Sequence, residues 1–546
     1  MIKIDLSKAY DRVSWLYIRM LLTHLGFCYD FIRWTMACIS TVSFAVLING
    51  SASPFFQAGR GLRQGCPLSP LLFLLVAEGL SRFILKAKAD GSFRGTSISQ
   101  VMYITHLLFV DDILIFCDGT RQDIDKVVEG LNLVQVAAGM IVNIDKSTIT
   151  CSNLSEEEIL RLANRLPYRT LDLDDGLMYL GFHFKPNAYL KADWHWLIAK
   201  LEKRLHVWSQ KWLSRAGRLV LVKSVLEAIP VYWMSLAWIP KGVLEQIRRL
   251  CFAFLWKGKS DNKALVWVGW EKIAVPKALG GWGLKNIFMF AKALGAKVSW
   301  RLIHTQSLWT RVVYHKYIAP LTLLDWIRLG NKSRANCSVV WKAVVQHFNL
   351  VGAGLVWRIG NGRLIRIGLD PWVGCRGGHV LPEELRHHLA DRGCHFLADI
   401  EDLGLSTLWY QGWINAQRLG IPEGLQGAWE GYLLLLRHSH IRLTHRADEL
   451  IWGLHPSGVY SPKNGYIQLN VEAHNRDLVW WWKSLWKIKC PGKAKLLFWA
   501  ILNNKAPTWD ILQKRFLQGP GFCPLCREAE ETISHLFMHC RFSQAV

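Results

Sequence analysis

The chain has 546 residues, of which 51% are hydrophobic and 28 are tryptophan, a composition that predicts a folded protein and excludes a disordered one. Its 66 Lys and Arg against 42 Asp and Glu give a formal net charge of +24, which favours a polyanionic partner such as nucleic acid. No apolar run reaches the ~18 residues of a membrane span, no secretory signal opens the chain, and the 13 cysteines are an odd, scattered set, so we expect a nuclear or cytoplasmic protein with no membrane contact.

Alternating strands and helices are predicted for the first part of the chain. Ile2, Ile4 and Leu6 alternate with polar residues, which is the period of a strand that carries Asp5 on its polar face. A helix over Trp15 to Leu25 follows, and then a strand over Ala45 to Ile48 that ends in the turn Asn49-Gly50. Ser69 as N-cap before Pro70 predicts a helix to about Lys88.

Two apolar strands, Tyr103 to Val110 and Ile113 to Phe116, are predicted to join at Asp111-Asp112. A helix near Ile124 to Ala137 and a short strand pair through Ile141 to Thr150 come next. This interleaving predicts an α+β layered domain.

The adjacent acids Asp111 and Asp112 interrupt an apolar stretch, and two carboxylates beside a buried hairpin are costly without a compensating cation. Together with Asp5 at the end of another strand they could supply oxygen ligands for Mg²⁺. An ordinary Asp-Asp turn exposed at a hairpin tip is the alternative for the dipeptide alone.

From Trp194 the pattern changes to that of an amphipathic helix, with apolar residues at three- and four-residue steps. Residues 186–301 hold 20 Lys and Arg against 6 acids, whereas residues 1–185 hold 18 of each and residues 302–546 hold 28 against 18. We therefore expect the nucleic-acid-facing surface here, with a Lys-rich solvated helix as the alternative. The basic candidates are Lys200, Lys203, Arg204 and Lys211. The tryptophans of this helix are expected in the core rather than stacked on bases.

A Cys/His cluster ends the chain as C-x2-C-x8-H-x4-C, formed by Cys523, Cys526, His535 and Cys540. Three thiolates and one imidazole are a closed ligand set for a structural Zn²⁺. Unliganded reduced thiols are the alternative, and His539 is the competing fourth ligand.

Several motifs in the first part of the chain occur in a fixed order. They are Asp5 with Tyr10-Asp11, Gly61 to Pro70, Phe109 to Asp112, Gly139 with Asn143 and Lys146-Ser147, and Tyr179-Leu180-Gly181. This order resembles the palm of reverse transcriptases of non-LTR, LINE-type retrotransposons. The later stretches LSRAGRLVLVKSVLEAIPVYWM, WRIGNGRLIRIGLDPW and the Cys/His segment extend the resemblance to the plant-type members.

The resemblance implies an RNA-directed DNA polymerase that takes an RNA template, a DNA primer and dNTPs. Asp5, Asp111 and Asp112 match the family's ligands for two Mg²⁺ ions, with Mn²⁺ as a substitute, and Lys146 matches a lysine near the pyrophosphate, against a solvent-facing lysine as the alternative. Tyr10 matches the steric-gate aromatic, with plain core packing as its alternative. Gln64 and Gly65 match the loop against template and nucleotide, and Tyr179 and Gly181 match the primer-grip turn.

The resemblance also implies a domain order. We expect a palm over 1–185, a basic helical thumb or connector over 186–303, a Trp/Gly-rich region of unknown role over 304–460 and a zinc-binding helical domain over 461–546. Because Met1 precedes the first palm strand by a single residue, most of the fingers are expected to be missing, with polymerase activity weakened by the truncation. The competing functions are a non-catalytic nucleic-acid-binding protein that uses the basic region and the zinc site, and a decayed reading frame whose product does not fold.

Overall fold

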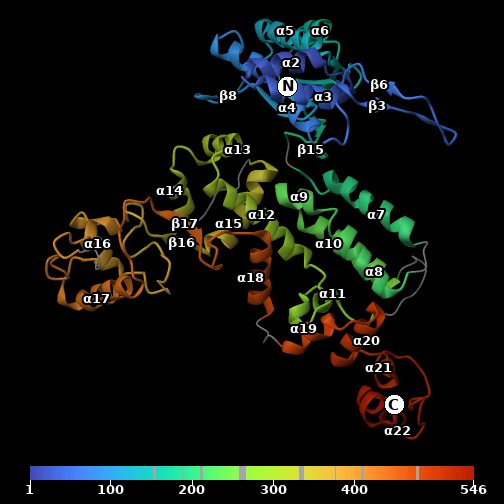
Figure 1. Cartoon of the computed structure of the whole chain (residues 1–546). Coiled ribbons are helices and arrows are strands. Elements are labelled where there is room, and N and C mark those ends of the chain that lie inside the picture. The colour runs from blue at the N-terminus through green and yellow to red at the C-terminus, as the bar shows by residue number, and fades with distance from the viewer. Residues whose placement is uncertain are drawn as a thin grey trace. The chain divides into compact units, whose positions relative to one another are not determined.

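The computed structural model describes residues 1–151, 155–186, 189–209, 213–257, 266–330, 337–375, 377–406, 411–474 and 479–546. They form two compact units (Figure 1). Unit 1 comprises Met1–Ala188 and Gln306–Trp326, and unit 2 comprises Tyr189–Thr305 and Ile327–Val546. None of the described helices combines the length and the apolar character needed to cross a bilayer.

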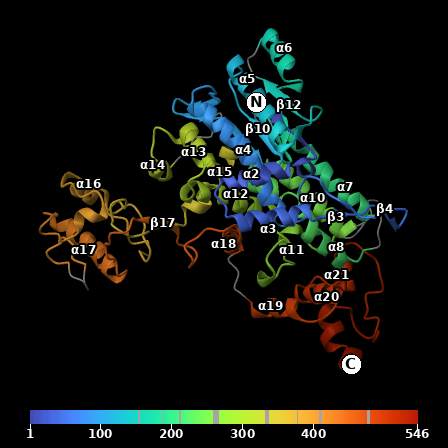
Figure 2. The same cartoon turned by 45° about the horizontal axis from the view of Figure 1, so that its top comes forward.

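A five-stranded sheet in the order β13-β12-β1-β10-β9 is the centre of unit 1. Its strands are β1 (Ile2–Ile4), β9 (His106–Phe109), β10 (Asp112–Ile115), β12 (Thr148–Cys151) and β13 (Arg169–Asp172). All neighbours are antiparallel except β12 and β13. Figure 2 shows β10 and β12 beside the N-terminal residues.

Shorter ladders surround this sheet. They are β2 (Leu6–Ser7) with β11 (Ile141–Val142), β3 (Ser43–Phe44) with β6 (Phe56–Gln57), β4 (Leu47–Ile48) with β5 (Ser51–Ala52), β7 (Thr96–Ser99) with β8 (Met102–Ile104), and β14 (Leu177–Tyr179) with β15 (Phe182–Phe184). The helices of unit 1 are α1 (Ala9–Arg12), α2 (Trp15–His24), α3 (Tyr29–Ser40), α4 (Ser69–Ala89), α5 (Arg121–Ala138), α6 (Glu156–Arg165), α13 (Leu308–Val313) and η4 (Tyr314–Ile318).

The two faces of β1 differ in what they contact. Ile2 and Ile4 are buried in a core that also holds Phe73 of α4 and Leu131 of α5, whereas Lys3 and Asp5 lie on the opposite face. The alternation predicted for this strand is therefore present, and it leaves the face with Asp5 uncovered by these helices.

Three local predictions need correction. Ser69 is the first helical residue and Leu68 the N-cap, because the amide of Leu72 already bonds to the carbonyl of Leu68. Residues 103–110 do not form one strand, since β8 ends at Ile104 and β9 begins at His106, and the hairpin tip is Val110-Asp111 with Asp112 already in β10. The strands over Ile141 to Thr150 do not pair with each other, because β11 pairs with β2 and β12 pairs with β1.

Unit 2 is mostly helical. Its first part contains η1 (Ala192–Trp194), α7 (His195–Ser209), α8 (Arg215–Leu221), η2 (Val222–Leu226), α9 (Val231–Leu236), α10 (Lys241–Lys257), α11 (Trp270–Ile273), η3 (Lys277–Leu279) and α12 (Ile287–His304). After α14 (Leu323–Arg328), which begins in unit 1, come α15 (Val339–Gly352), β16 (Leu355–Arg358), α16 (Glu383–Asp391), η5 (Leu397–Ile400), α17 (Glu423–His438), β17 (Glu449–Trp452) and α18 (Pro462–His474). The last elements are α19 (Trp480–Lys487), α20 (Gly492–Leu502), α21 (Trp509–Gln513), η6 (His535–His539) and α22 (Arg541–Gln544).

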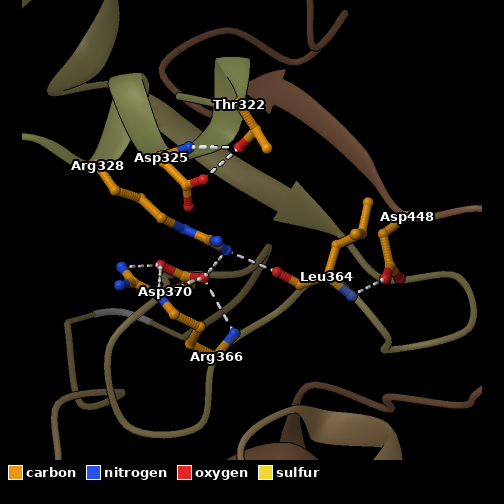
Figure 3. A network of polar contacts seen from close by, with 7 residues as sticks. All are labelled: Thr322, Asp325, Arg328, Leu364, Arg366, Asp370 and Asp448. Atoms are coloured by element: carbon orange, nitrogen blue, oxygen red, sulfur yellow. Dashed lines mark hydrogen bonds and ion pairs between the residues drawn. The ribbon is translucent and has the colours of Figure 1, made fainter. Parts of the chain in front are cut away.

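Buried carboxylates organise the Trp/Gly-rich part of unit 2 (Figure 3). Asp448 accepts backbone hydrogen bonds from Gly360 at 2.7 Å, Gly362 at 2.9 Å and Leu364 at 3.0 Å. Asp370 forms ion pairs with Arg366 at 2.9 Å and Arg328 at 2.5 Å. These bonds shape the loop that follows β16, where the WRIGNGRLIRIGLDPW stretch lies.

Candidate active site and metal centre

Asp5 directly follows β1, and Asp112 is the first residue of the neighbouring strand β10. The register pairs Ile4 of β1 with Ile113 of β10, so the next position along places Asp5 opposite Asp112. Residues opposite each other in an antiparallel pair share a face, and this is the face that carries Lys3. Two of the three predicted carboxylates therefore converge through strand register, although 107 positions separate them in the sequence.

Asp111 is placed by a tight hairpin turn. Phe109 pairs with Asp112, which leaves Val110 and Asp111 as the two turn residues. Val110 has a φ of +55°, a left-handed conformation that is rare for a β-branched residue. Its side chain packs against the core of unit 1, so packing holds the turn in this conformation and Asp111 at its tip.

The electrostatics of the cluster centre on Asp112, which is partly buried. Burial raises the pKa of its carboxyl, the positive charge of Lys3 lowers that pKa, and the charges of Asp111 and Asp5 raise it further. The charges of Asp5 and Asp111 therefore both act on the carboxyl of Asp112. The three carboxylates are not among the groups of ligand atoms close enough to hold a metal ion as they stand. Within the described ranges, that group is the C-terminal Cys/His set, whose ligand atoms lie within 4.8 Å of one another.

The donor chemistry of this cluster fits a hard divalent cation. Carboxylate oxygens are the ligands that Mg²⁺ takes in proteins, and a cation between like charges would relieve the repulsion that raises the pKa of Asp112.

The turn that carries Lys146 is hydrogen-bonded to Asp5. The amide of Asp5 donates to the hydroxyl of Ser147 at 3.1 Å, and the carbonyl of Asp5 accepts from the amide of Asn143 at 2.8 Å. Ser147 is fully buried, whereas Lys146 is exposed. Lys146 therefore lies on a turn that is hydrogen-bonded to Asp5, and its side chain is exposed to solvent.

Tyr10 stacks on Phe73 of α4 with ring centroids 4.7 Å apart and an interplanar angle of 9°. Burial raises the pKa of its hydroxyl, and the charge of Asp111 adds to that rise. The ring is only partly buried, and its contact with Phe73 supports it from the core.

The Gly-rich loop lies directly against α1. The amide of Leu62 donates to the carbonyl of Tyr10 at 2.7 Å, and Gln64 Nε2 donates to Asp11 Oδ1 at 3.3 Å. Gly61 has a φ of +88°, and a Cβ there would lie 2.5 Å from the carbonyl oxygen of Asp11, so only glycine fits. Gly65 has a φ of +83° and open space around it, so glycine is favoured there by the backbone conformation and not by lack of room.

The β14–β15 hairpin also reaches the cluster. Lys3 Nζ donates to the carbonyl of Met178 at 3.1 Å. Burial raises the pKa of Tyr179, and the charge of Asp112 raises it further. Leu180 and Gly181 form the turn with φ of +48° and +75°. Lys3 thus links the β14–β15 hairpin to β1, while the Gly-rich loop contacts α1.

Two residues of this site were not among the predicted functional residues. Lys3 supplies the positive charge nearest to Asp112, and the alternation of Ile2, Lys3, Ile4 and Asp5 already placed it on the same face as Asp5. Ser147 follows Lys146 in one of the ordered motifs, but no local sequence signal predicts its bond to the amide of Asp5.

The C-terminal cluster brings together Cys523, Cys526, His535 and Cys540. The sulfurs of Cys523 and Cys540 are 3.9 Å apart, and Cys526 Sγ lies 3.2 Å from His535 Nε2. A tetrahedron with Zn–S bonds of about 2.3 Å has sulfurs roughly 3.8 Å apart, so this donor set fits Zn²⁺. The exposed His539 is not part of the cluster.

The basic helix α7 buries Leu197 and Leu201 and exposes Lys200, Lys203 and Arg204. Trp194, just before it, is in the core, as expected for this stretch. Lys200 Nζ lies 5.1 Å from the ring centroid of Trp233, so its ammonium group forms a cation–π contact within unit 2. Lys211 lies outside the described residues.

Two family models match the chain. Residues 1–184 match the reverse transcriptase (RNA-dependent DNA polymerase) family, and residues 460–546 match the family described as zinc-binding in reverse transcriptase. The first match contains the carboxylate cluster and the second contains the Cys/His cluster.

Several proteins are similar to this chain. A putative ribonuclease H protein of Arabidopsis thaliana is 28% identical over 351 residues, which cover 63% of this chain and 53% of that protein. The retrovirus-related Pol polyprotein from the type-2 retrotransposable element R2DM of Drosophila melanogaster is 25% identical over 259 residues, 45% of this chain and 23% of that protein. The chain thus spans about half or less of the length of these relatives. Among solved structures, telomerase from Candida tropicalis with a fragment of telomeric RNA aligns with a TM-score of 0.25 and 15% identity over 46% of this chain and 37% of that one, too weak a likeness to support an argument.

Proposed function

We propose that this chain is the RNA-directed DNA polymerase of a non-LTR retrotransposon, which extends a DNA primer on an RNA template with dNTPs. The matches of residues 1–184 to the reverse transcriptase family and of residues 460–546 to the family described as zinc-binding in reverse transcriptase support this proposal. The observation that supports the proposal is that the register of β1 with β10 puts Asp5 opposite Asp112, with Asp111 at the adjoining hairpin tip.

Asp5, Asp111 and Asp112 would hold the two divalent cations. When bound, these ions would activate the 3′-hydroxyl of the primer and stabilise the negative charge on the pyrophosphate that leaves. The residues of the chain then position the reactants, because phosphoryl transfer needs placement more than covalent catalysis. Lys146, on the turn bonded to Asp5, offers a positive charge for the phosphates of the incoming nucleotide.

Tyr10 acts as the gate for the sugar in this proposal. Its stacking on Phe73 holds the ring in place, so that a ribose 2′-hydroxyl would meet a rigid edge. Gln64 and Gly65 line the path of template and nucleotide, and Tyr179 with Gly181 supports the primer end beside Asp112.

Primer extension tests the proposal. The purified chain, given an RNA template, a DNA primer, dNTPs and Mg²⁺ or Mn²⁺, should synthesise cDNA. Asp111→Asn should lower the rate at least about 100-fold, because it removes a ligand of the metals that stabilise the transition state. Asp90→Asn, at the exposed end of α4, is the matched control and should leave the rate unchanged.

Equal cDNA synthesis by wild type and Asp111→Asn would overturn the assignment of the carboxylates, and no synthesis by the wild type with either metal would overturn the polymerase. Nucleic-acid binding without catalysis is the second candidate, favoured by the exposed charges of Lys203 and Arg204 on α7.

A further inference from the structure

Among the described residues of unit 2, two tryptophans are exposed, whereas Trp194, Trp282 and Trp499 are buried. The exposed pair is Trp480 and Trp481, with 74% and 44% of their surface exposed, in the first turn of α19 (Figure 1). Their ring centroids are 6.0 Å apart and the planes are almost perpendicular. Large apolar rings in solvent are costly, so this pair calls for a function.

The opposite face of α19 anchors the helix in unit 2. Leu485 is buried, and the ring of Trp482 lies against Gly280, where a Cβ would be 2.9 Å from it. Lys277 Nζ lies 5.0 Å from the ring centroid of Trp486. Packing thus accounts for Trp482, Leu485 and Trp486 and leaves Trp480 and Trp481 pointing away from these contacts.

The chain that follows the exposed pair is basic. Trp480, Lys483, Ser484 and Lys487 are all exposed and lie three or four residues apart, so they form one stripe along α19. Lys489 and Lys493 continue the exposed charge after the helix. Residues 479–509 contain six lysines and no Asp or Glu. The site therefore combines a positive field with flat rings.

We propose that Trp480 and Trp481 form a platform whose two rings, almost perpendicular to each other, each stack on a different base of a single-stranded nucleic acid while the lysines of the stripe contact its phosphates. Proteins that bind single strands without sequence preference use this combination of basic surface and aromatic rings. A single strand offers phosphates and base faces together, which matches the lysines and the rings of this site. The platform is a site in unit 2 apart from the carboxylate cluster, so it goes beyond the polymerase reaction.

The test uses the full chain and two fluorescent oligomers of equal length, oligo(dT) and an abasic sugar–phosphate chain, in anisotropy titrations at several salt concentrations. Wild type should bind oligo(dT) more tightly than the abasic oligomer. The double variant Trp480→Ala/Trp481→Ala should lose at least about 10-fold in affinity for oligo(dT), since stacking contributes ~1–3 kcal/mol per base, and should bind the abasic oligomer as before.

Two further variants separate stacking from other causes. Trp480→Leu/Trp481→Leu keeps apolar surface but removes the rings, and we expect the same loss as with alanine. Trp34→Ala, which removes a tryptophan that is 61% exposed on α3, is the matched control and should bind both oligomers like wild type.

Wild-type affinity for oligo(dT) in either double variant, or equal wild-type binding of the two oligomers, would overturn the platform. Because both tryptophans are exposed, the variants should keep the circular dichroism spectrum of wild type, which checks the fold. The measurement needs no dNTPs and no polymerisation, so a failure of the polymerase proposal would not be mistaken for a failure of this one.

Discussion

Individual residues hold the carboxylate cluster together through unusual backbone conformations. Val110 adopts a φ of +55° at the hairpin tip, and Gly61 adopts +88° against the carbonyl of Asp11. The local sequence does not favour the conformation of Val110, and no residue other than glycine fits the space at Gly61. The strain at Val110 is kept because its side chain packs in the core, which places Asp111 next to Asp112.

A residue-scale prediction concerns the choice between the two histidines near the C-terminus. His535→Ala should abolish zinc binding, because the imidazole completes the set with Cys523, Cys526 and Cys540. His539→Ala, an exposed histidine four positions away, should keep about one zinc per chain. Metal content measured by mass spectrometry on dialysed protein checks both.

Removal of zinc by a chelator should also lower the melting temperature of wild type and of His539→Ala, because a structural zinc site contributes folding energy. Loss of zinc in His539→Ala with retention in His535→Ala would contradict the ligand set, and zinc in neither variant nor wild type would favour unliganded thiols.

At the scale of elements, the loop after β16 depends on the buried Asp448 just before β17. Its carboxylate accepts hydrogen bonds from the backbone N–H groups of residues 360, 362 and 364, and Figure 3 shows the one from Leu364. The strands pair so that Arg358 lies opposite Glu449, and these two side chains form an ion pair at 2.8 Å in solvent. Asp448 and Glu449 are neighbours in the sequence, but only the buried Asp448 holds the backbone of the loop, whereas Glu449 pairs with Arg358 in solvent.

We therefore predict different effects for Asp448→Ala and Glu449→Ala. Asp448→Ala leaves three amides without their acceptor and should cost at least about 2 kcal/mol of unfolding free energy. Glu449→Ala removes an exposed pair and should change it by less than ~1 kcal/mol. Urea denaturation gives the two values, and hydrogen exchange of Gly360, Gly362 and Leu364 shows whether the loss is in this loop. Similar losses in both variants would contradict the role assigned to Asp448.

The whole molecule carries a net charge of +24. The excess of basic residues is largest in residues 186–301, which hold 20 Lys and Arg against 6 Asp and Glu. Charge on this scale governs the salt dependence and rate of association with a polyanion, not the fold. In α7 the apolar side packs in unit 2, and Lys203 and Arg204 remain in solvent for such contacts.

Replacing Lys203 and Arg204 by Gln should weaken binding to a single-stranded oligonucleotide and flatten the plot of log affinity against log salt, by roughly 0.7 for each phosphate that the variant no longer neutralises. Lys126→Gln, whose amine pairs with Glu129 at 2.7 Å, is the control and should leave the slope unchanged. Fluorescence anisotropy between low and high salt checks the slopes. The same slope in all three proteins would remove α7 from the interface.

The sequence by itself determined those features that depend on neighbours along the chain. The alternation of Ile2, Lys3, Ile4 and Asp5 placed Asp5 on the open face of a strand, and the Cys/His spacing predicted the four ligands that the structure brings together. The sequence predicted the helix that begins at Trp15 and the helix near Pro70, although it put the start of the second one residue too late. The ordered motifs identified the reverse transcriptase resemblance before any contact was known.

Only the tertiary structure decided which distant groups meet. The register of β1 with β10 brings Asp5 opposite Asp112, and the bond from Asp5 to Ser147 ties the Lys146 turn to the same place. It also leaves Trp480 and Trp481 in solvent while burying other tryptophans of unit 2 that look alike in sequence. The physical reason is that periodicity sets which side of an element is apolar, whereas strand register, burial and the unusual φ of residues such as Val110 come from packing against segments far away along the chain.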